Sequence, residues 1–578
     1  MTETLDKNYD ALVVGSGAAG SIAVKELTER GLDVLLLEAG RDISEPDFKP
    51  PPETQPRPLS TGIGIGLGSR LRAALKGQHV QARRAFFMPV ANPFLVNDRE
   101  NPYSTARDSY FLWIRGRVLG GRLHTYGRVL LRMSDYDFKG ASRDGIGLDW
   151  PISYADLAPY YDQVEEFLGL YGQRDGLAQL PDGVYVGPSK LTKAEQQFKA
   201  RIESHWPERR VVSWRYAAPN PGRVPLGIAA ARKTGRLTTR TDAVVRQITV
   251  ENKTGKADGA IFVDRLTKEE HRVSANVVVL CASTIESIRL LHNSACDRHP
   301  SGLGNSSGLL GRFFMDQAPS LTFGSIPGVH GFERDESAPV DPVYPPAGGV
   351  FIPRFHNLDG QPRAGFARGM SFQAAMGRFP VPEERTAAFA MMGYGEMLPS
   401  YDNRVTLHPS KTDAWGIRIP HIRCAVGENE RALMREQVRI VKEMAAACGY
   451  DLNFTGSPLG LDARKVFPEA DPISRIAFRL GFRRTVAMGA AIHECGGARL
   501  GTDPATSVLN EYNQSWDVPN LFVTDASCFP SSGLVGPTLT IMALTARTCD
   551  YIARQYTEGR WDSETTPLRT HPNHGSRP

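Results

Sequence analysis

The sequence has no hydrophobic run long enough to cross a membrane, and its cysteines are few. The longest apolar block lies around Val277–Ala282, far short of the ~18 to 20 residues that a membrane helix needs. The seven cysteines are scattered, without the spacing of a zinc site or an iron–sulfur cluster. We therefore expect no membrane span, no metal site and buried or incidental thiols.

The sequence also lacks a strong excess of one charge. It has 68 Lys and Arg against 63 Asp and Glu in 578 residues, a formal net charge of +5. So small a surplus, with no interleaving of aromatic and basic residues, disfavours a nucleic-acid partner. The N-terminus enters a folded motif at once and shows no export signal, so we expect a cytoplasmic protein.

A glycine-rich turn near the N-terminus predicts dinucleotide binding. The apolar run Ala11–Val14 leads into GSGAAG at residues 15–20, which a helix and a second strand follow. The three glycines allow, in order, a tight turn, close approach of amides to a pyrophosphate, and close packing of helix on strand. An acidic residue ends the second strand, where it can bind a ribose. The predicted site consists of Gly15, Gly17, Ala18, Ala19, Gly20 and Glu38; a purely structural turn is the alternative.

Other segments predict local features. Residues 153–169 read as an amphipathic helix with Ser153 as N-cap, and Val273–Leu280 reads as a buried strand. Residues 46–104 interrupt the pattern and are expected to be an insertion or lid, and the tail at 557–578 is expected to be disordered. The insertion carries a basic cluster that we expect to be a solvated face, with a partner or membrane-surface role as the alternative. Its members are Arg70, Arg72, Lys76, Arg83 and Arg84.

Five separated segments together resemble the glucose-methanol-choline (GMC) oxidoreductases. They are the glycine turn, Arg115–Phe138, Val277–Leu291, His493–Gly501 and Val523–Arg547. Within that family the chain is similar to the bacterial branch of FAD-dependent glucoside 3-dehydrogenases and glycoside 3-oxidases.

This resemblance implies an α/β fold with two interleaved domains. One is a Rossmann-like FAD-binding domain built from discontinuous segments. The other is an α+β substrate domain with an antiparallel sheet, as in p-hydroxybenzoate hydroxylase-like proteins. We expect the first at 1–45, 105–135, 225–320 and 485–556, and the second at 136–224 and 321–484.

The resemblance also implies FAD, bound non-covalently, and assigns residues to it. The loop after Arg115 is expected to lie along the flavin and pyrophosphate, and the C-terminal segment is expected near the diphosphate, the ribityl chain and flavin N1. The assigned residues are Arg117, Val118, Gly121, Thr125, Val244, Asp525, Ala526, Pro537 and Thr538. His124 is expected to be packed or hydrogen-bonded; covalent attachment, known from pyranose oxidases at a slightly different offset, is the alternative.

His493 matches the catalytic base of the family, and histidine suits that task because its ordinary pKa of ~6.5 lies near working pH. The family usually supplies a second Asn or His, but this sequence has Gly536 there. Either another residue substitutes, the space admits a bulkier substrate, or the chain is weakly active.

The expected reaction is oxidation of a secondary alcohol of a sugar or glycoside, with C3 as one candidate position, to a ketone by hydride transfer to flavin N5. Oxygen, a quinone or another compound would accept the electrons, and the oligomeric state stays open. The alternatives are a non-redox lyase or isomerase on the same scaffold, an amino-sugar alcohol dehydrogenase of secondary metabolism, and a binding protein with structural FAD.

Overall fold

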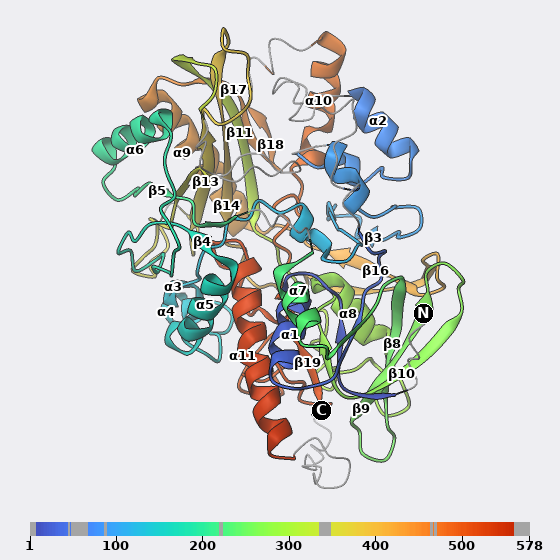
Figure 1. Ribbon diagram of the computed structural model, residues 1–578. Coiled ribbons are helices and arrows are strands. Elements are labelled where there is room, and N and C mark those ends of the chain that lie inside the picture. The colour runs from blue at the N-terminus through green and yellow to red at the C-terminus, as the bar shows by residue number, and fades with distance from the viewer. Residues whose placement is uncertain are drawn as a thin grey trace, which may run out of the picture.

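The computed structural model describes residues 7–43, 47, 67–85, 89–218, 224–333, 348–363, 365–462, 466 and 471–559 (Figure 1). Most of the predicted insertion before residue 67, and the predicted disordered tail beyond residue 559, lie outside the described residues. The division into domains therefore stays a prediction, whereas the sheets can be described directly.

A seven-stranded sheet lies in the lower half of Figure 1, in the order β7-β2-β1-β10-β9-β8, with β19 also paired to β10. The strands are β7 (Leu237–Arg240), β2 (Val34–Leu37), β1 (Asn8–Val14), β10 (Glu270–Leu280), β9 (Ala257–Asp264), β8 (Ala243–Val250) and β19 (Leu521–Val523). The pairs among β7, β2, β1, β10 and β19 are parallel, while β8 and β9 are antiparallel additions. This arrangement confirms the Rossmann-like sheet.

Helices pack on this sheet or on the helices next to it, through apolar contacts. They are α1 (Ala18–Glu29), α5 (Tyr154–Leu168), α7 (Leu226–Lys233), α8 (Thr284–Asn293) and α11 (Thr538–Thr557). The strongly apolar face of α1 packs on β1 and on α11, with Ala19, Ala23 and Leu27 in one core cluster with Ile552. The predicted helix at 153–169 is confirmed as α5: Ser153 forms a capping box with Asp156, and Gly169 ends the helix in the left-handed region.

A second sheet, antiparallel throughout, lies in the upper part of Figure 1 and has the order β18-β17-β11-β14-β13-β12-β5. Its strands are β18 (Gly460–Asp462), β17 (Asp451–Ser457), β11 (Ala318–His330), β14 (Thr386–Gly395), β13 (Met370–Met376), β12 (Val350–Ile352) and β5 (Val212–Ser213). The long helix α9 (Glu428–Cys448) packs across β11, β14 and β17, and α6 (Lys193–His205) packs on α9. The expected antiparallel sheet is therefore present.

Smaller elements complete the described chain. A three-stranded sheet joins β3 (Ser104–Thr105), β16 (Arg418–Arg423) and β15 (Arg404–Thr412), and β4 (Leu170–Tyr171) pairs with β6 (Tyr216–Ala217). The remaining helices are α2 (Leu67–Leu75), α3 (Asp135–Phe138), α4 (Gly140–Asp144) and α10 (Pro472–Thr485), with 3-10 turns η4 (Gln81–Arg83), η5 (Pro89–Phe94), η6 (Gly121–His124) and η7 (Ala526–Cys528). None of the helices described combines the length and apolar character needed to cross a bilayer.

The expectation that the basic cluster at residues 70–84 is a solvated face is wrong in part. Arg84 is buried, and its guanidinium donates to the Gln81 carbonyl at 2.8 Å. The guanidinium of Arg70 donates to the carbonyls of Ala82 and Arg84. These side chains fasten α2 to the following segment, which charge alone could not reveal. Arg72 and Lys76 are exposed, as expected.

Candidate active site

The glycine turn between β1 and α1 shows three different demands at its three glycines. Gly15 has φ +96°, and a Cβ there would lie 2.5 Å from the Cys281 carbonyl oxygen. A Cβ on Gly20 would overlap the carbonyl of Gly15 itself. Around Gly17, the N-cap of α1, a Cβ would meet nothing within 4 Å. Packing therefore leaves no room for a side chain at the first and third glycines. The second faces open space at a helix N-terminus, where a phosphate group fits.

A buried network joins this turn to the second glycine pair. The Ser16 hydroxyl donates to the carboxylate of Glu38 and accepts the Gly120 amide at 2.8 Å. The other oxygen of Glu38 accepts the Gly40 amide at 2.7 Å. Burial raises the pKa of Glu38, against the hydrogen bonds that lower it. Glu38 thus lies directly beside the glycine turn, as a ribose ligand would require; its contact with a ribose stays a prediction.

The end of β2 also meets two segments that are distant in sequence. The Ala243 amide donates to the Glu38 carbonyl at 2.9 Å, which places Val244 next to this strand end. On the other side, Val118 pairs with Arg41, and a Cβ on Gly40 would overlap the backbone of Arg117. Predicted adenine and pyrophosphate residues from three parts of the chain therefore gather at one edge of the sheet.

The loop after residue 115 packs against the glycine turn. Gly120 and Gly121 both have positive φ, and a Cβ on Gly121 would approach the Gly17 Cα at 3.7 Å. Thr125 caps the short η6 turn at its C-terminal end. The ring of His124 lies 2.8 Å from the Leu119 carbonyl through Nε2 and stacks on Phe94. This is the packed and hydrogen-bonded environment expected for His124.

The first two arginines of this loop are mostly shielded from solvent. Arg115 is buried, and both Arg115 and Arg117 lie 3.5 Å from one carboxylate oxygen of Glu286 in α8. Burial alone would raise the pKa of Glu286, but Arg289, Arg117 and Arg115 together lower it to about 2. These side chains fix the loop, and the cofactor role of Arg117 stays a prediction.

The C-terminal segment brings Asp525 and the start of α11 to the same region. Asp525 follows β19, is buried, and accepts hydrogen bonds from Ser287 and from the amide and hydroxyl of Ser527. Burial raises its pKa. Ala526 begins the η7 turn, and Pro537 is the N-cap of α11, so the Thr538 amide lies at a helix N-terminus. The positive end of that helix can stabilise a negative charge.

His493 is held at its backbone and at its ring by two adjacent residues. Its amide donates to Asp316 at 3.1 Å, and Asp316 also accepts the Gly489 amide at 2.6 Å. Its Nδ1 lies 2.7 Å from Oε1 of Gln317. The Tyr394 ring lies 5.1 Å from the imidazole. Both anchoring residues directly precede β11, so this strand positions the histidine.

The orientation of the Gln317 amide decides the tautomer of His493. Gln317 is fully buried, and its Nε2 donates to the carbonyls of Gly533 and Val535, each at 3.0 Å. A carbonyl only accepts, so the nitrogen of the amide must face these two groups and the oxygen must face the histidine. The imidazole therefore carries its proton on Nδ1, and its Nε2 has a free lone pair.

Gly536 lies against that free nitrogen. A Cβ on Gly536 would stand 3.4 Å from Nε2 of His493 and 3.7 Å from its Cε1, with no third neighbour within 4 Å. The expected second side chain is thus missing next to the base, and space lies there instead. The family resemblance predicted that these two residues lie side by side although 43 positions separate them in the sequence. They are adjacent in the structure.

The electrostatics keep His493 neutral. Desolvation by the surrounding protein, and secondarily Arg122, lower the pKa of His493 to about 3. Arg122 in turn lies 2.8 Å from the buried carboxylate of Glu494. Burial, with Glu494 adding to it, raises the pKa of Asp316 to about 7. A neutral imidazole with a free Nε2 can accept a proton from a hydroxyl, and its low pKa makes it a weaker base than an ordinary histidine.

Sequence reasoning missed Asp316, Gln317, Glu494 and the role of Arg122. No spacing motif marks these residues, because their contacts cross 173 and 177 positions for Asp316 and 176 or more for Gln317. The only signal was their proximity to the recognised segments: Glu494 follows the predicted base, and Arg122 follows the paired glycines.

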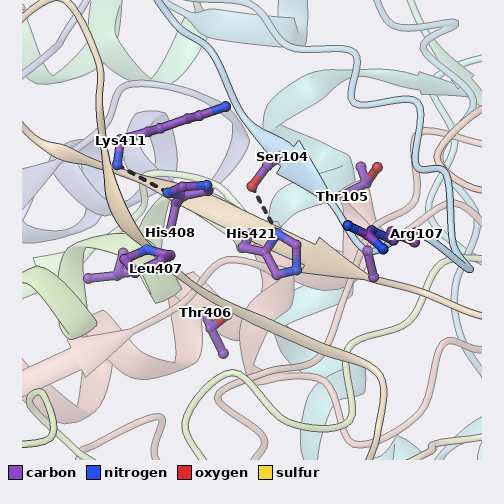
Figure 2. A pocket seen from close by; sticks show the side chains of 10 residues that line it. Ser104, Thr105, Arg107, Thr406, Leu407, His408, Lys411 and His421 are labelled. Carbon is purple, nitrogen blue, oxygen red and sulfur yellow. Dashed lines mark hydrogen bonds between the residues drawn. The ribbon is translucent and has the colours of Figure 1, made fainter.

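A separate cavity lies on the small sheet of β3, β15 and β16. Its volume is about 770 Å³. Figure 2 shows the side chains that line it, among them Ser104, Arg107, His408, Lys411 and His421. Ser104 Oγ lies 2.9 Å from Nδ1 of His421. None of the predicted cofactor or catalytic residues is among the residues that line it, so it is distinct from the site around His493.

Comparison with known proteins agrees with this geometry. Two profiles described as GMC oxidoreductase match residues 9–317 and 399–545. The chain is 28% identical to the 2-methyl-1,2-propanediol dehydrogenase of Mycolicibacterium austroafricanum, over 98% of this chain and 99% of that protein. It is 26% identical to the fructose dehydrogenase large subunit of Gluconobacter japonicus, over 96% and 99% of the two chains.

The fold is shared with a solved formate oxidase from Aspergillus oryzae, at a TM-score of 0.64 and 16% identity, over 96% of this chain and 99% of that one. In the present chain, the open surroundings of Gly17, the network around Glu38 and the helix start at Thr538 suit the dinucleotide that this family uses. The chain belongs to the GMC oxidoreductase family, and it is an FAD-dependent enzyme that acts on CH–OH groups.

Proposed function

We propose that the chain oxidises a secondary alcohol of a sugar or glycoside to a ketone, with His493 as the base. The observation that carries the chemistry is the free Nε2 of His493, which Gln317 leaves unprotonated next to the space at Gly536. FAD, bound along the glycine turn, Glu38, Val118, Val244, Asp525 and Thr538, supplies the acceptor for the hydride that leaves the carbinol carbon.

The protein side of the reaction is removal of the hydroxyl proton. As the carbinol C–H bond gives up its hydride, the O–H proton passes to Nε2 of His493 and the C–O bond becomes a carbonyl. The imidazolium so formed keeps Nδ1–H on Gln317 Oε1. Because its pKa is low, His493 returns the proton readily, which resets the base for the next turnover.

The sugar or glycoside part of the proposal rests on the space at Gly536 and on the relatives. A bulky secondary alcohol needs room on both sides of the carbinol carbon, and Gly536 places no side chain beside the base. The fructose dehydrogenase large subunit is one relative that acts on a sugar. Oxidation at C3 follows only from the resemblance to the glycoside branch.

The test is anaerobic reduction of the bound flavin across a panel of sugars, glycosides and amino sugars. Bleaching by a glycoside in the wild type, lost in His493→Ala at equal flavin content, supports the proposal. If no member of the panel bleaches the flavin, the substrate class is wrong. Product formation with the flavin oxidised throughout would indicate the lyase or isomerase alternative. Reoxidation by oxygen, a quinone or a dye then identifies the acceptor.

A second candidate substrate is a short branched diol. Its support is the 2-methyl-1,2-propanediol dehydrogenase, which matches 98% of this chain. The space at Gly536 also suits a carbinol next to a branched carbon. Including this diol in the same panel separates the two: reduction by the diol but by no sugar or glycoside would select the second candidate.

A further inference from the structure

Two helices of the protein present apolar side chains to solvent instead of burying them. Five of the eleven exposed large apolar residues in the described part of the chain lie on α2 and α10. Their exposed fractions are 58% for Leu71, 66% for Leu75, 71% for Ile473, 59% for Ile476 and 81% for Leu480. Single exposed apolar residues are ordinary, but several on one helix are typical of an interaction surface.

The helix α10 is apolar on two opposite sides. One side carries Phe478 and Phe482, which pack into a core cluster with Phe454 of the antiparallel sheet. At about 100° per residue, Ile473, Ile476 and Leu480 fall together on the opposite side. Burial of the inner side accounts for the folding of α10, while the outer side stays exposed among the residues that the structure describes.

The two helices belong to one face of the molecule. Arg70 of α2 donates to the carbonyls of Ala82 and Arg84, and the next residue, Ala85, joins the core cluster that contains Phe482 of α10. Arg83 donates to the Tyr110 hydroxyl at 3.0 Å, and Arg484 stands over the ring of the same tyrosine. Figure 1 shows α2 and α10 beside each other at the upper right edge.

Cations flank the exposed apolar side chains. Neither helix contains an Asp or Glu between its first and last residue. Around α10, Arg479 and Arg483 fall on one flank of the apolar stripe and Arg484 on the other. All three are exposed, and none forms a salt bridge with a residue in the described ranges. The exposed Arg72 of α2 adds a further charge.

We infer that α2 and α10 form a docking surface for an anionic lipid bilayer, on which the protein lies without crossing it. Exposed Leu and Ile enter the boundary between head groups and acyl chains, while flanking arginines bind the anionic head groups. A symmetric contact between two copies would instead bring two arginine-flanked patches of the same charge together, because a two-fold interface uses the same patch on both copies. The charge pattern therefore favours lipid.

The experiment is flotation of the full-length, FAD-loaded protein with vesicles of phosphatidylcholine alone or mixed with phosphatidylglycerol. We expect binding to the anionic vesicles that weakens as salt is raised. Ile476→Gln with Leu480→Gln should lower the partition coefficient at least about tenfold, because two apolar side chains no longer enter the bilayer. Arg479→Glu with Arg483→Glu should lower it by about a hundredfold.

The matched control is Leu266→Gln, since Leu266 is 67% exposed but lies in the turn between β9 and β10. It should bind vesicles as the wild type does. All variants should keep wild-type flavin content and melting temperature, because the replaced side chains are exposed. The inference is overturned if anionic vesicles do not bind at low salt, or if neither double variant weakens binding. It is also overturned if light scattering shows a dimer that Ile476→Gln with Leu480→Gln abolishes while vesicle binding is absent.

Discussion

Oε1 of Gln317 lies 2.7 Å from Nδ1 of His493, and the amide nitrogen of the same Gln317 is held by two backbone carbonyls. The histidine is therefore fixed in one tautomer by a side chain that is itself fully buried. This makes Gln317 a positioning residue for the proposed base, and its contribution can be measured separately from its packing.

The first prediction concerns replacement of Gln317. Gln317→Leu should lower kcat/KM by about 10- to 100-fold, because the imidazole loses its fixed tautomer and part of a general-base effect of ~10² to 10⁴. Gln317→Glu keeps an acceptor for Nδ1–H and adds a negative charge, so it should raise the pKa of His493 and shift the acid limb of the kcat/KM profile upward. If Gln317 were only structural, both variants would lower the melting temperature and leave the pH profile in place.

The second prediction concerns pH. Because the pKa of His493 is lowered to about 3, the base is neutral throughout the neutral range. We expect no loss of kcat/KM attributable to His493 as pH falls from about 8 to 5, although a free histidine would titrate near ~6.5. An acid limb near pH 6.5 that Gln317→Glu moves upward would show instead that His493 has an ordinary pKa.

The same shift affects stability, with a sign that follows from linkage. Between about pH 6.5 and 3 the unfolded chain binds a proton at residue 493 that the folded chain does not. Folding therefore loses stability as the pH falls through this range. His493→Gln removes that contribution, so the difference in melting temperature between variant and wild type should shift in favour of the variant on acidification.

The third prediction compares Gly17 and Gly20, which are three residues apart in the sequence but have different surroundings. Gly20→Ala should destabilise the protein by about 3 kcal/mol, because its Cβ would overlap the backbone of Gly15. Gly17→Ala meets no atom within 4 Å and has a φ of −70°, so the apoprotein should keep its melting temperature. It should nevertheless bind FAD more weakly, since a methyl group would occupy the space proposed for the pyrophosphate.

Flavin fluorescence titration and thermal unfolding of the apoprotein distinguish the two effects. Equal loss of FAD affinity and apoprotein stability in Gly17→Ala would contradict the assignment of this open position to the cofactor. Gly31→Ala is unsuitable as a control because Gly31 has a φ of +92°, whereas Gly68 has open surroundings and no positive φ. Gly68 lies in the first turn of α2, so Gly68→Ala should leave FAD affinity unchanged and keep or slightly raise the melting temperature of the apoprotein.

The fourth prediction concerns Gly536. Gly536→Asn adds a side chain whose Cβ stands 3.4 Å from Nε2 of His493, and the backbone there does not require glycine. The amide restores a hydrogen-bond partner for a substrate hydroxyl. Such an interaction can raise kcat by up to ~10²- to 10³-fold. We expect a higher kcat with small alcohols and a higher KM with glycosides. An unchanged ratio of kcat/KM between the two substrate classes would show that the space does not select the substrate.

The sequence predicted those parts of the site that depend on local geometry. The glycine turn, the capping of α5 by Ser153 and the buried strand β10 follow from residues close to one another, and the structure confirms them. The pairing of His493 with Gly536 came from the resemblance to a family, because nothing in either segment alone brings them together.

The rest depends on contacts between distant segments. Gln317 sits in an unremarkable stretch of sequence, and its role arises only when the carbonyls of Gly533 and Val535 meet its amide. Arg84 looked like a surface charge until the fold placed it inside, with its guanidinium on Gln81 and Asn92. A charged residue in the sequence indicates that its side chain needs water or a polar partner. Only the tertiary structure identifies that partner.

The pairing of β10 has a consequence for how the protein is made. One edge of β10 pairs with β1, but the end of its other edge, at Val278–Leu280, pairs only with Leu521–Val523 near the far end of the chain. During synthesis that edge stays open until some 240 further residues have been added. An apolar strand edge open for so long can pair with other chains. Production of this protein should therefore depend on slow translation or chaperones, and truncation before β19 should yield aggregates.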